Sequence, residues 1–79
     1  MSKEKEMNEE LFYKKAKYYS LNKIPVHIKL VNGFYYNGII LEVTTDYFIL
    51  DDEKINEFPV WFSEVIKLEV KKTREEVGV

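Results

Sequence analysis

The chain contains no cysteine among its 79 residues, so neither a disulfide nor a thiolate metal site can stabilise it. A chain of this length forms one small domain, which needs either dense packing or contacts with other subunits. The lack of cysteine also fits a reducing compartment, and we therefore expect the protein in the cytoplasm.

Long apolar runs and an excess of basic residues are missing as well. No segment is apolar over enough length to cross a bilayer, and the start, MSKEKEMNEE, is too polar for a secretory signal. Twelve basic and fourteen acidic residues give a formal charge of −2 and a pI near 5.4. This balance argues against a generic nucleic-acid binder, although it leaves room for local basic patches.

Aromatic residues, in contrast, are abundant: they make up 15% of the chain and include six tyrosines. A domain this small cannot bury all of these rings, so some of them should cover a subunit interface or a ligand surface. For Phe34, Tyr35, Tyr36, Tyr47 and Trp61 we favour packing in the core or between subunits over stacking on bases.

The first part of the chain predicts one amphipathic helix. Residues 1–7 are charged and are expected to be disordered, and Asn8 followed by two glutamates is typical of a helix N-cap. The helix should end near residues 20–22, because Pro25 disfavours helical geometry at the residue before it. Its apolar residues recur at roughly helical spacing and need a surface to lie on: Leu11, Phe12, Ala16, Tyr19 and Leu21.

From Val26 onward the apolar pattern has a period of two, which predicts β-strands. Asn32-Gly33 predicts a tight hairpin turn, and Gly38 predicts a bend or bulge within the second strand. Residues 51–57 predict a polar loop, Pro59 indicates an edge strand, and residues 71–79 predict a solvated tail. The predicted strands are Val26–Leu30, Phe34–Val43, Tyr47–Leu50, Phe58–Phe62 and Val65–Val70. Five short strands in so small a domain favour a strongly bent antiparallel barrel, which makes residues 8–70 an all-β domain with an N-terminal helix.

The segments IPVHIKLVNGFYYNGII and VWFSEVIKLEV resemble the Sm-like (LSm) family, and among its members the bacterial Hfq type. The Pro25-Val26 entry into the first strand, the Asn32-Gly33 turn and Gly38 all lie where that family has them. The resemblance implies a five-stranded Sm-like barrel that assembles into a ring of six or seven subunits. It further implies single-stranded RNA as partner and a role as RNA chaperone or RNA-processing factor.

In such rings the fourth strand of one subunit pairs with the fifth strand of its neighbour. The resemblance therefore implies a subunit interface that contains Val60, Trp61, Phe62, Ile66 and Leu68.

The two RNA-binding faces of the family differ in how well this chain matches them. In the pore, Thr44, Phe48 and Phe62-Ser63 stand where the family has polar and cationic residues, so the groups that hold uridine are missing. On the opposite face, the resemblance assigns purine-rich RNA to a lysine, two aromatic rings, an amide and a turn glycine, a set suited to phosphate contacts and base stacking. These candidates are Lys29, Gly33, Phe34, Tyr35 and Asn37. Weaker candidates for phosphate contacts at the rim are Lys14, Lys15, Lys17 and Lys23.

An enzyme is not expected, because no nucleophile–base pair, metal cluster or phosphate loop is recognisable. His27 is the single histidine and should lie on the outward phase of its strand. The acidic run Asp51-Asp52-Glu53 lacks the spaced ligands of a calcium loop, so we interpret it as a solvated turn and expect no cofactor. The alternative function is an oligomeric protein-interaction or structural module that uses the same barrel without binding RNA.

Overall fold

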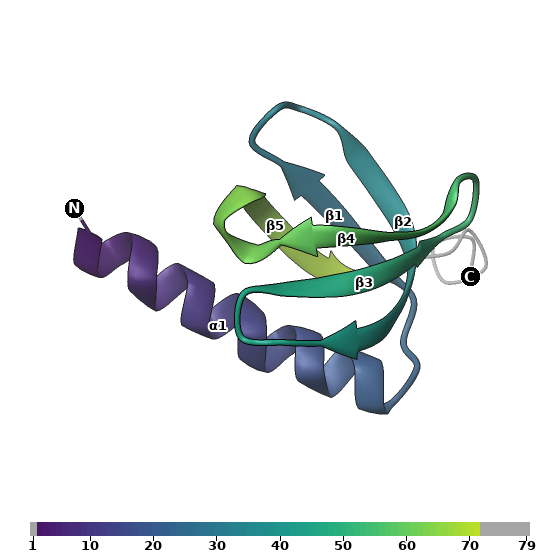
Figure 1. Cartoon of the computed structure of the whole chain (residues 1–79), viewed down its shortest axis with the longest axis horizontal. Coiled ribbons are helices and arrows are strands. Elements are labelled where there is room, and N and C mark those ends of the chain that lie inside the picture. Colours follow the sequence, from purple (N-terminus) through teal and green to yellow (C-terminus); the bar gives the residue numbers. More distant parts are fainter. Residues whose placement is uncertain (1, 72–79) are drawn as a thin grey trace, which may run out of the picture.

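The computed structural model describes residues 2–71 of the chain, with side chains from Glu9 onward. An N-terminal helix is followed by five strands and a short 3-10 turn (Figure 1). The elements in chain order are α1 (Ser2–Leu21), β1 (Val26–Leu30), β2 (Tyr35–Val43), β3 (Tyr47–Asp52), β4 (Asn56–Trp61), η1 (Phe62–Glu64) and β5 (Val65–Val70).

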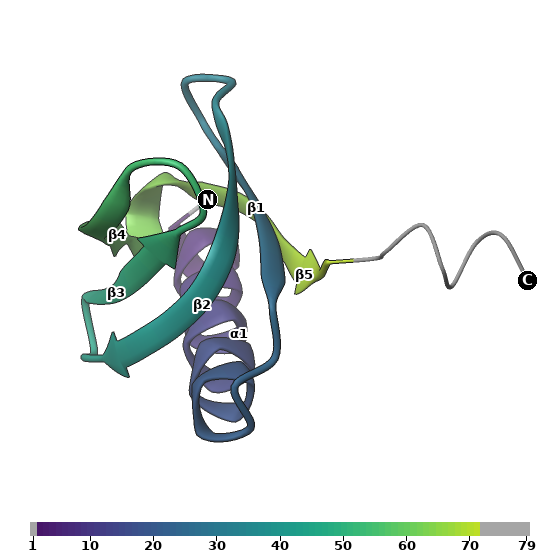
Figure 2. The same cartoon turned by 90° about the vertical axis from the view of Figure 1, so that its right-hand side faces the viewer.

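All five strands belong to one antiparallel sheet with the order β4-β3-β2-β1-β5. The sheet bends strongly around its inner face but does not close, so β4 and β5 remain its two edges (Figures 1 and 2). This architecture confirms the predicted fold class, and Pro59 lies on an edge strand as expected. A row of unpaired backbone groups on each edge invites pairing with another strand.

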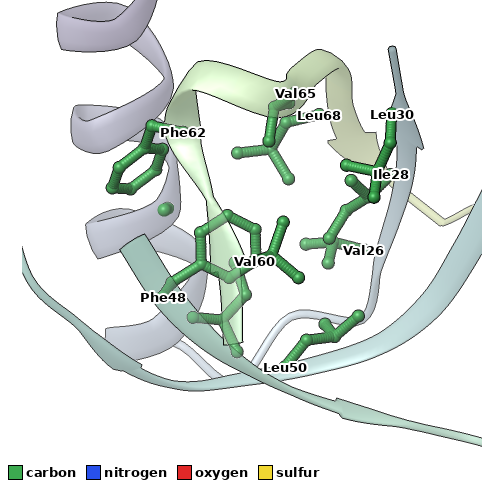
Figure 3. Close-up of a cluster of buried hydrophobic side chains, with 11 residues drawn as sticks. Val26, Ile28, Leu30, Phe48, Leu50, Val60, Phe62, Val65 and Leu68 are labelled. Atoms are coloured by element: carbon green, nitrogen blue, oxygen red, sulfur yellow. The ribbon is translucent and has the colours of Figure 1, made fainter. Parts of the chain in front are cut away.

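The core lies inside the bend of the sheet and is apolar throughout. Strand β1 shows the expected alternation, with Val26, Ile28 and Leu30 buried and the residues between them half-buried. Side chains from every strand converge on the same space (Figure 3). The buried core consists of Ala16, Val26, Ile28, Leu30, Ile40, Phe48, Leu50, Val60, Phe62, Val65 and Leu68.

Helix α1 covers the inner side of the sheet with a face that differs from the predicted one. Ala16 is fully buried, and Tyr13 packs edge-on against Phe62 with 6.1 Å between the ring centroids. Leu11 and Leu21, which were expected in the apolar stripe, are 54% and 79% exposed. The small Ala16 side chain allows the helix to approach the core closely, and the rings beside it then determine which face is buried.

Both ends of the helix can be explained from the backbone. The helix already begins at Ser2, so the predicted N-cap at Asn8 is wrong. The lysine, glutamate and methionine residues that precede Asn8 are good helix formers. The helix can therefore extend through them although most are charged. At the other end, Ile24 N–H donates to Tyr19 O and Lys23 N–H to Ser20 O, with Lys23 at φ 52°. This pair of bonds is a Schellman motif, which ends the helix within the predicted range.

The β1–β2 hairpin turn is wider than the predicted two-residue turn. The N–H of Gly33 donates to Leu30 O, and Leu30 N–H donates to Phe34 O, which leaves residues 31–33 as a three-residue loop. Only Gly33, at φ 91°, has a left-handed conformation, whereas a two-residue Asn-Gly turn needs positive φ at both positions.

Gly38 also has a different role from the predicted one. Strand β2 is continuous there, and the register shifts instead between Ile40 and Glu42, where Leu41 is the extra residue. A Cβ atom at Gly38 would lie 2.1 Å from the backbone oxygen of Asp51. The glycine therefore permits a close approach of β2 and β3 at this point.

The segment predicted as a polar loop at residues 51–57 is largely part of the sheet. Asp51 and Asp52 continue β3, while Asn56 and Glu57 begin β4, so only residues 53–55 connect the two strands. Asp52 is buried rather than solvated. The hydrogen bonds that its carboxylate accepts from the turn explain how so polar a segment can form a tight hairpin.

Two further predictions concern the ends of the chain and the membrane. Residues 72–79, most of the predicted tail, lie outside the described residues. Within residues 2–71, no helix is both long and apolar enough to span a bilayer.

Candidate nucleic-acid interface

Three of the five candidate RNA-binding residues lie together on the outer face of β1 and β2. Lys29 is paired with Tyr35 across the two strands, and its Nζ lies 5.4 Å from the centre of the Tyr35 ring. Asn37 is the next outward residue along β2. Tyr35 is 54% exposed. The strand register thus brings a cation, an aromatic ring and an amide together on one open surface.

His27 links two of these residues. It lies on the outward phase of β1, as predicted, directly opposite Asn37. Its Nδ1 is 2.7 Å from Asn37 Oδ1, and its ring stacks on Tyr35 with 5.2 Å between centroids and 18° between planes. The histidine is therefore not an isolated surface side chain, because it contacts both the ring and the amide of the candidate site.

Lys67 belongs to the same surface and was missed from the sequence. Strand β5 lies on the other side of β1, and the register pairs Lys67 with Lys29 and Glu69 with His27. Neither lysine forms an ion pair with another described residue. Only the pairing of β5 with β1 could have identified Lys67, because none of the other candidate RNA-binding residues lies near it in the sequence.

The other two candidates lie at the hairpin tip, which stands well away from helix α1 in both views (Figures 1 and 2). Gly33 shapes the turn through its positive φ. Phe34 is 59% exposed, but its ring packs edge-on against Tyr36 at 6.4 Å. Phe34 follows the opposite strand phase from Tyr35, so the two rings do not form one stacking platform.

A hollow of about 150 Å³ borders the outer face at the start of β2. Tyr35, Tyr36 and Asn37 line one side of it, and residues 52–55 of the β3–β4 turn line the other. It lies next to the amide of Asn37, so a planar group stacked near Tyr35 could extend into it.

The buried carboxylate of Asp52 holds this hollow in shape. It accepts hydrogen bonds from the backbone N–H groups of Lys54 and Ile55 at 2.8 and 3.2 Å, and from that of Asn37 at 3.2 Å. Burial alone raises the pKa of Asp52, but these three donors and the charge of Lys54 together leave that pKa below its ordinary value. Asp52 is therefore ionised at neutral pH and fixes the turn against β2.

The candidate rim lysines lie on or after helix α1, away from the outer face of β1 and β2. Lys14, Lys17 and Lys23 are exposed, and Lys15 is half-buried. Lys17 places its Nζ 5.7 Å from the centre of the Tyr13 ring.

The five candidate interface residues separate into two groups. Val60, Phe62 and Leu68 are at most 2% exposed and fill the core of their own chain, so their side chains cannot contact a neighbour. Trp61 and Ile66 are 46% and 49% exposed on the two edge strands. Trp61 points outward, whereas Val60 and Phe62 on either side of it point into the core. The interface itself stays a prediction.

Thr44, Phe48 and Phe62, which the resemblance aligns with pore residues, have structural roles in this chain. Thr44 Oγ1 accepts hydrogen bonds from the N–H groups of Asp46 and Tyr47 and donates to Tyr47 O, which closes the β2–β3 turn. Phe48 and Phe62 are buried with 5.3 Å between their ring centroids. Among the residues with described side chains, no three histidine or carboxylate groups are arranged to hold a metal ion.

Comparison with known proteins yields a match in structure but not in sequence. No protein-family model matches the chain, and no curated protein matches it. A crystal structure of "the pleiotropic translational regulator, Hfq" is similar, with a TM-score of 0.66 and 19% sequence identity. The similarity covers 72% of this chain and 93% of that one. The chain therefore has the Sm-like fold.

Proposed function

We propose that this chain is an RNA-binding protein that holds single-stranded RNA on the outer face of β1, β2 and β5. The observation that carries the proposal is the cluster of Lys29, Tyr35 and Asn37 on one exposed surface. Lysine attracts phosphate, an exposed ring stacks on a base, and an amide reads a base edge. Lys67 adds a second cation beside Lys29. The likeness to a translational regulator agrees with a role as RNA chaperone or RNA-processing factor in the cytoplasm.

Binding of oligo-A and oligo-U RNA at low and high salt tests the proposal. We expect an affinity that falls as salt rises, because phosphate contacts release counterions. The double variant Lys29→Glu, Tyr35→Ala should abolish binding. A matched double variant on the helix, Lys14→Glu with Tyr18→Ala, should lower the affinity at most about threefold, the effect of a single peripheral phosphate contact. Folded protein that binds neither RNA would refute the proposed function.

We also propose that the chain works as a ring of six or seven copies. The two unpaired edges β4 and β5 support this, because an edge strand of one copy can pair with the opposite edge of the next. The exposed Trp61 and Ile66 would then be covered. Sedimentation should give a mass of six or seven chains at micromolar concentration, and a monomer would contradict the ring.

A second candidate function is a protein-interaction or structural module of the same assembly. It is favoured by one observation: on the outer side of β2, β3 and β4, an apolar groove lies between exposed glutamates. This candidate predicts that the Lys29→Glu, Tyr35→Ala variant assembles normally and that the wild-type protein fails to bind RNA.

A further inference from the structure

His27 contacts two residues of the proposed RNA-binding face but lies outside the set that was assigned to it. Its Nδ1 is 2.7 Å from Asn37 Oδ1, and its ring stacks on Tyr35. From these two contacts we infer that His27 is a positioning residue, which sets the orientation of the Asn37 amide and of the Tyr35 ring and couples both to pH. The inference rests on the proposed function and adds the regulation of its site.

The hydrogen bond with Asn37 depends on the protons of the imidazole. A neutral imidazole either donates from Nδ1 to the amide oxygen or, as the other tautomer, accepts at Nδ1 from a rotated amide. Protonation removes the second arrangement, because both ring nitrogens of the imidazolium are donors. The protonated histidine therefore holds the amide oxygen of Asn37 toward the imidazole. The NH₂ group of Asn37 then faces solvent, where it donates to a nitrogen or oxygen acceptor on a base edge.

The stacking contact adds a second effect of the same proton. An imidazolium parallel to Tyr35 brings positive charge to the ring that is proposed to carry a base, next to Lys29. A negatively charged phosphate near this ring favours the protonated form. RNA binding and proton uptake at His27 should therefore strengthen each other.

The charged groups around this histidine come from β1 and β5, because its neighbours on β2 are the uncharged Tyr35 and Asn37. Glu69 occupies the paired position on β5, and Lys29 and Lys67 lie one pair along. Lys71, which follows β5, is engaged with Glu53. His27 is also the single histidine of the chain, so a pH-dependent effect that its substitution removes can be assigned to it.

The first experiment measures the binding of oligo-A RNA between pH 5.5 and 8.0. We expect wild-type protein to bind about fivefold more tightly at pH 5.5, because the imidazolium adds one positive charge beside the lysines that attract phosphate. The variant His27→Gln keeps an amide that can bond to Asn37 but cannot titrate, so its affinity should be independent of pH. His27→Phe keeps a ring against Tyr35 and loses the bond to Asn37, so it should bind more weakly over the whole range.

The second experiment follows the side-chain NH₂ signals of asparagine in ¹H–¹⁵N NMR spectra without RNA. The Asn37 signal should shift with pH between 5.5 and 8.0 in wild-type protein and stay constant in His27→Gln, while those of the exposed Asn22 and Asn32 stay constant in both. These spectra also report whether each variant is folded.

The outcomes separate the inference from the function on which it rests. RNA binding that is independent of pH in wild-type protein, or equally dependent on pH in His27→Gln, would overturn the role of His27 and leave the proposed function intact. An Asn37 signal that does not titrate would also overturn it. No RNA binding by folded wild-type protein at any pH would overturn both.

Discussion

The outer surface of the sheet has two halves with opposite chemistry. The half formed by β1, β5 and the start of β2 presents Lys29 and Lys67 with Tyr35. The half formed by the end of β2, β3 and β4 presents a groove of about 380 Å³ between the glutamates 42 and 57, with Leu41, Ile49, Phe58 and Pro59 as its other lining residues. A formal charge of −2 therefore conceals a polarised surface. For ligand binding, the local distribution of charge is more informative than the total.

Both halves depend on strand β2, which pairs with β1 on one side and β3 on the other. Gly38 is the position where they meet, since it is paired with Val26 and with Asp52. Three predictions separate what the halves share from what each does alone, and they begin with this position.

Replacing Gly38 by alanine should have the largest effect. A Cβ there would lie 2.1 Å from Asp51 O, and backbone atoms cannot move aside as a flexible side chain can. We expect the free energy of unfolding to fall by about 3 kcal/mol. Gly33→Ala is the matched control: a Cβ at Gly33 meets nothing within 4 Å, so only its φ of 91° opposes the change, at about 1 kcal/mol. Urea unfolding at a fixed protein concentration measures both, and equal losses would refute the role given to Gly38.

Asp52→Ala should have the next largest effect, because it leaves backbone donors of the β3–β4 turn and of β2 without their acceptor. At pH 7 we expect a loss of about 2 kcal/mol in the free energy of unfolding. Since folding lowers the pKa of Asp52, the part of its contribution that depends on charge is complete at neutral pH and is lost as the pH falls from about 4 through the lowered pKa.

Unfolding at pH 7 and at pH 3 tests this prediction. The difference between wild-type protein and Asp52→Ala should shrink at pH 3, while the exposed neighbour Asp51 can be replaced by alanine with little effect at either pH. A difference of the same size at both pH values would mean that the carboxylate charge is not what stabilises the turn.

The smallest expected effect sharpens the contrast between the two halves. Lys67→Glu should weaken RNA binding about tenfold, because it reverses a charge beside Lys29. Glu57→Lys changes the net charge by the same amount in the opposite sense on the other half, and it should alter the affinity less than about threefold. If Glu57→Lys strengthens binding as much as Lys67→Glu weakens it, total charge rather than the proposed face governs binding.

The parts of the fold that depend on local pattern could be predicted from the sequence. The alternation of Val26, Ile28 and Leu30 identified β1, and Pro25 placed the end of the helix correctly. Local pattern was misleading where charge was interpreted as exposure. The charged residues before Asn8 belong to the helix, and Asp52 is buried because the turn supplies donors to its carboxylate.

The candidate site was only partly predictable, because its geometry depends on strand register. Lys29, Tyr35 and Asn37 were grouped through the resemblance to the Hfq type, and the register of one hairpin brings them together. Lys67 joins them only through the pairing of β1 with β5, which connects residues far apart in the chain. The contact of His27 with Asn37 likewise depends on a register that the wider, three-residue turn sets.

Trp61 has a spectroscopic consequence. It is the single tryptophan of the chain, and it lies on edge strand β4, 46% exposed, with its ring 4.9 Å from that of Tyr47. Because the indole is outside the core, its emission reports the environment of one edge of the sheet. A strand that covers this edge would shift the emission to shorter wavelength and leave the far-ultraviolet circular dichroism of the chain nearly unchanged.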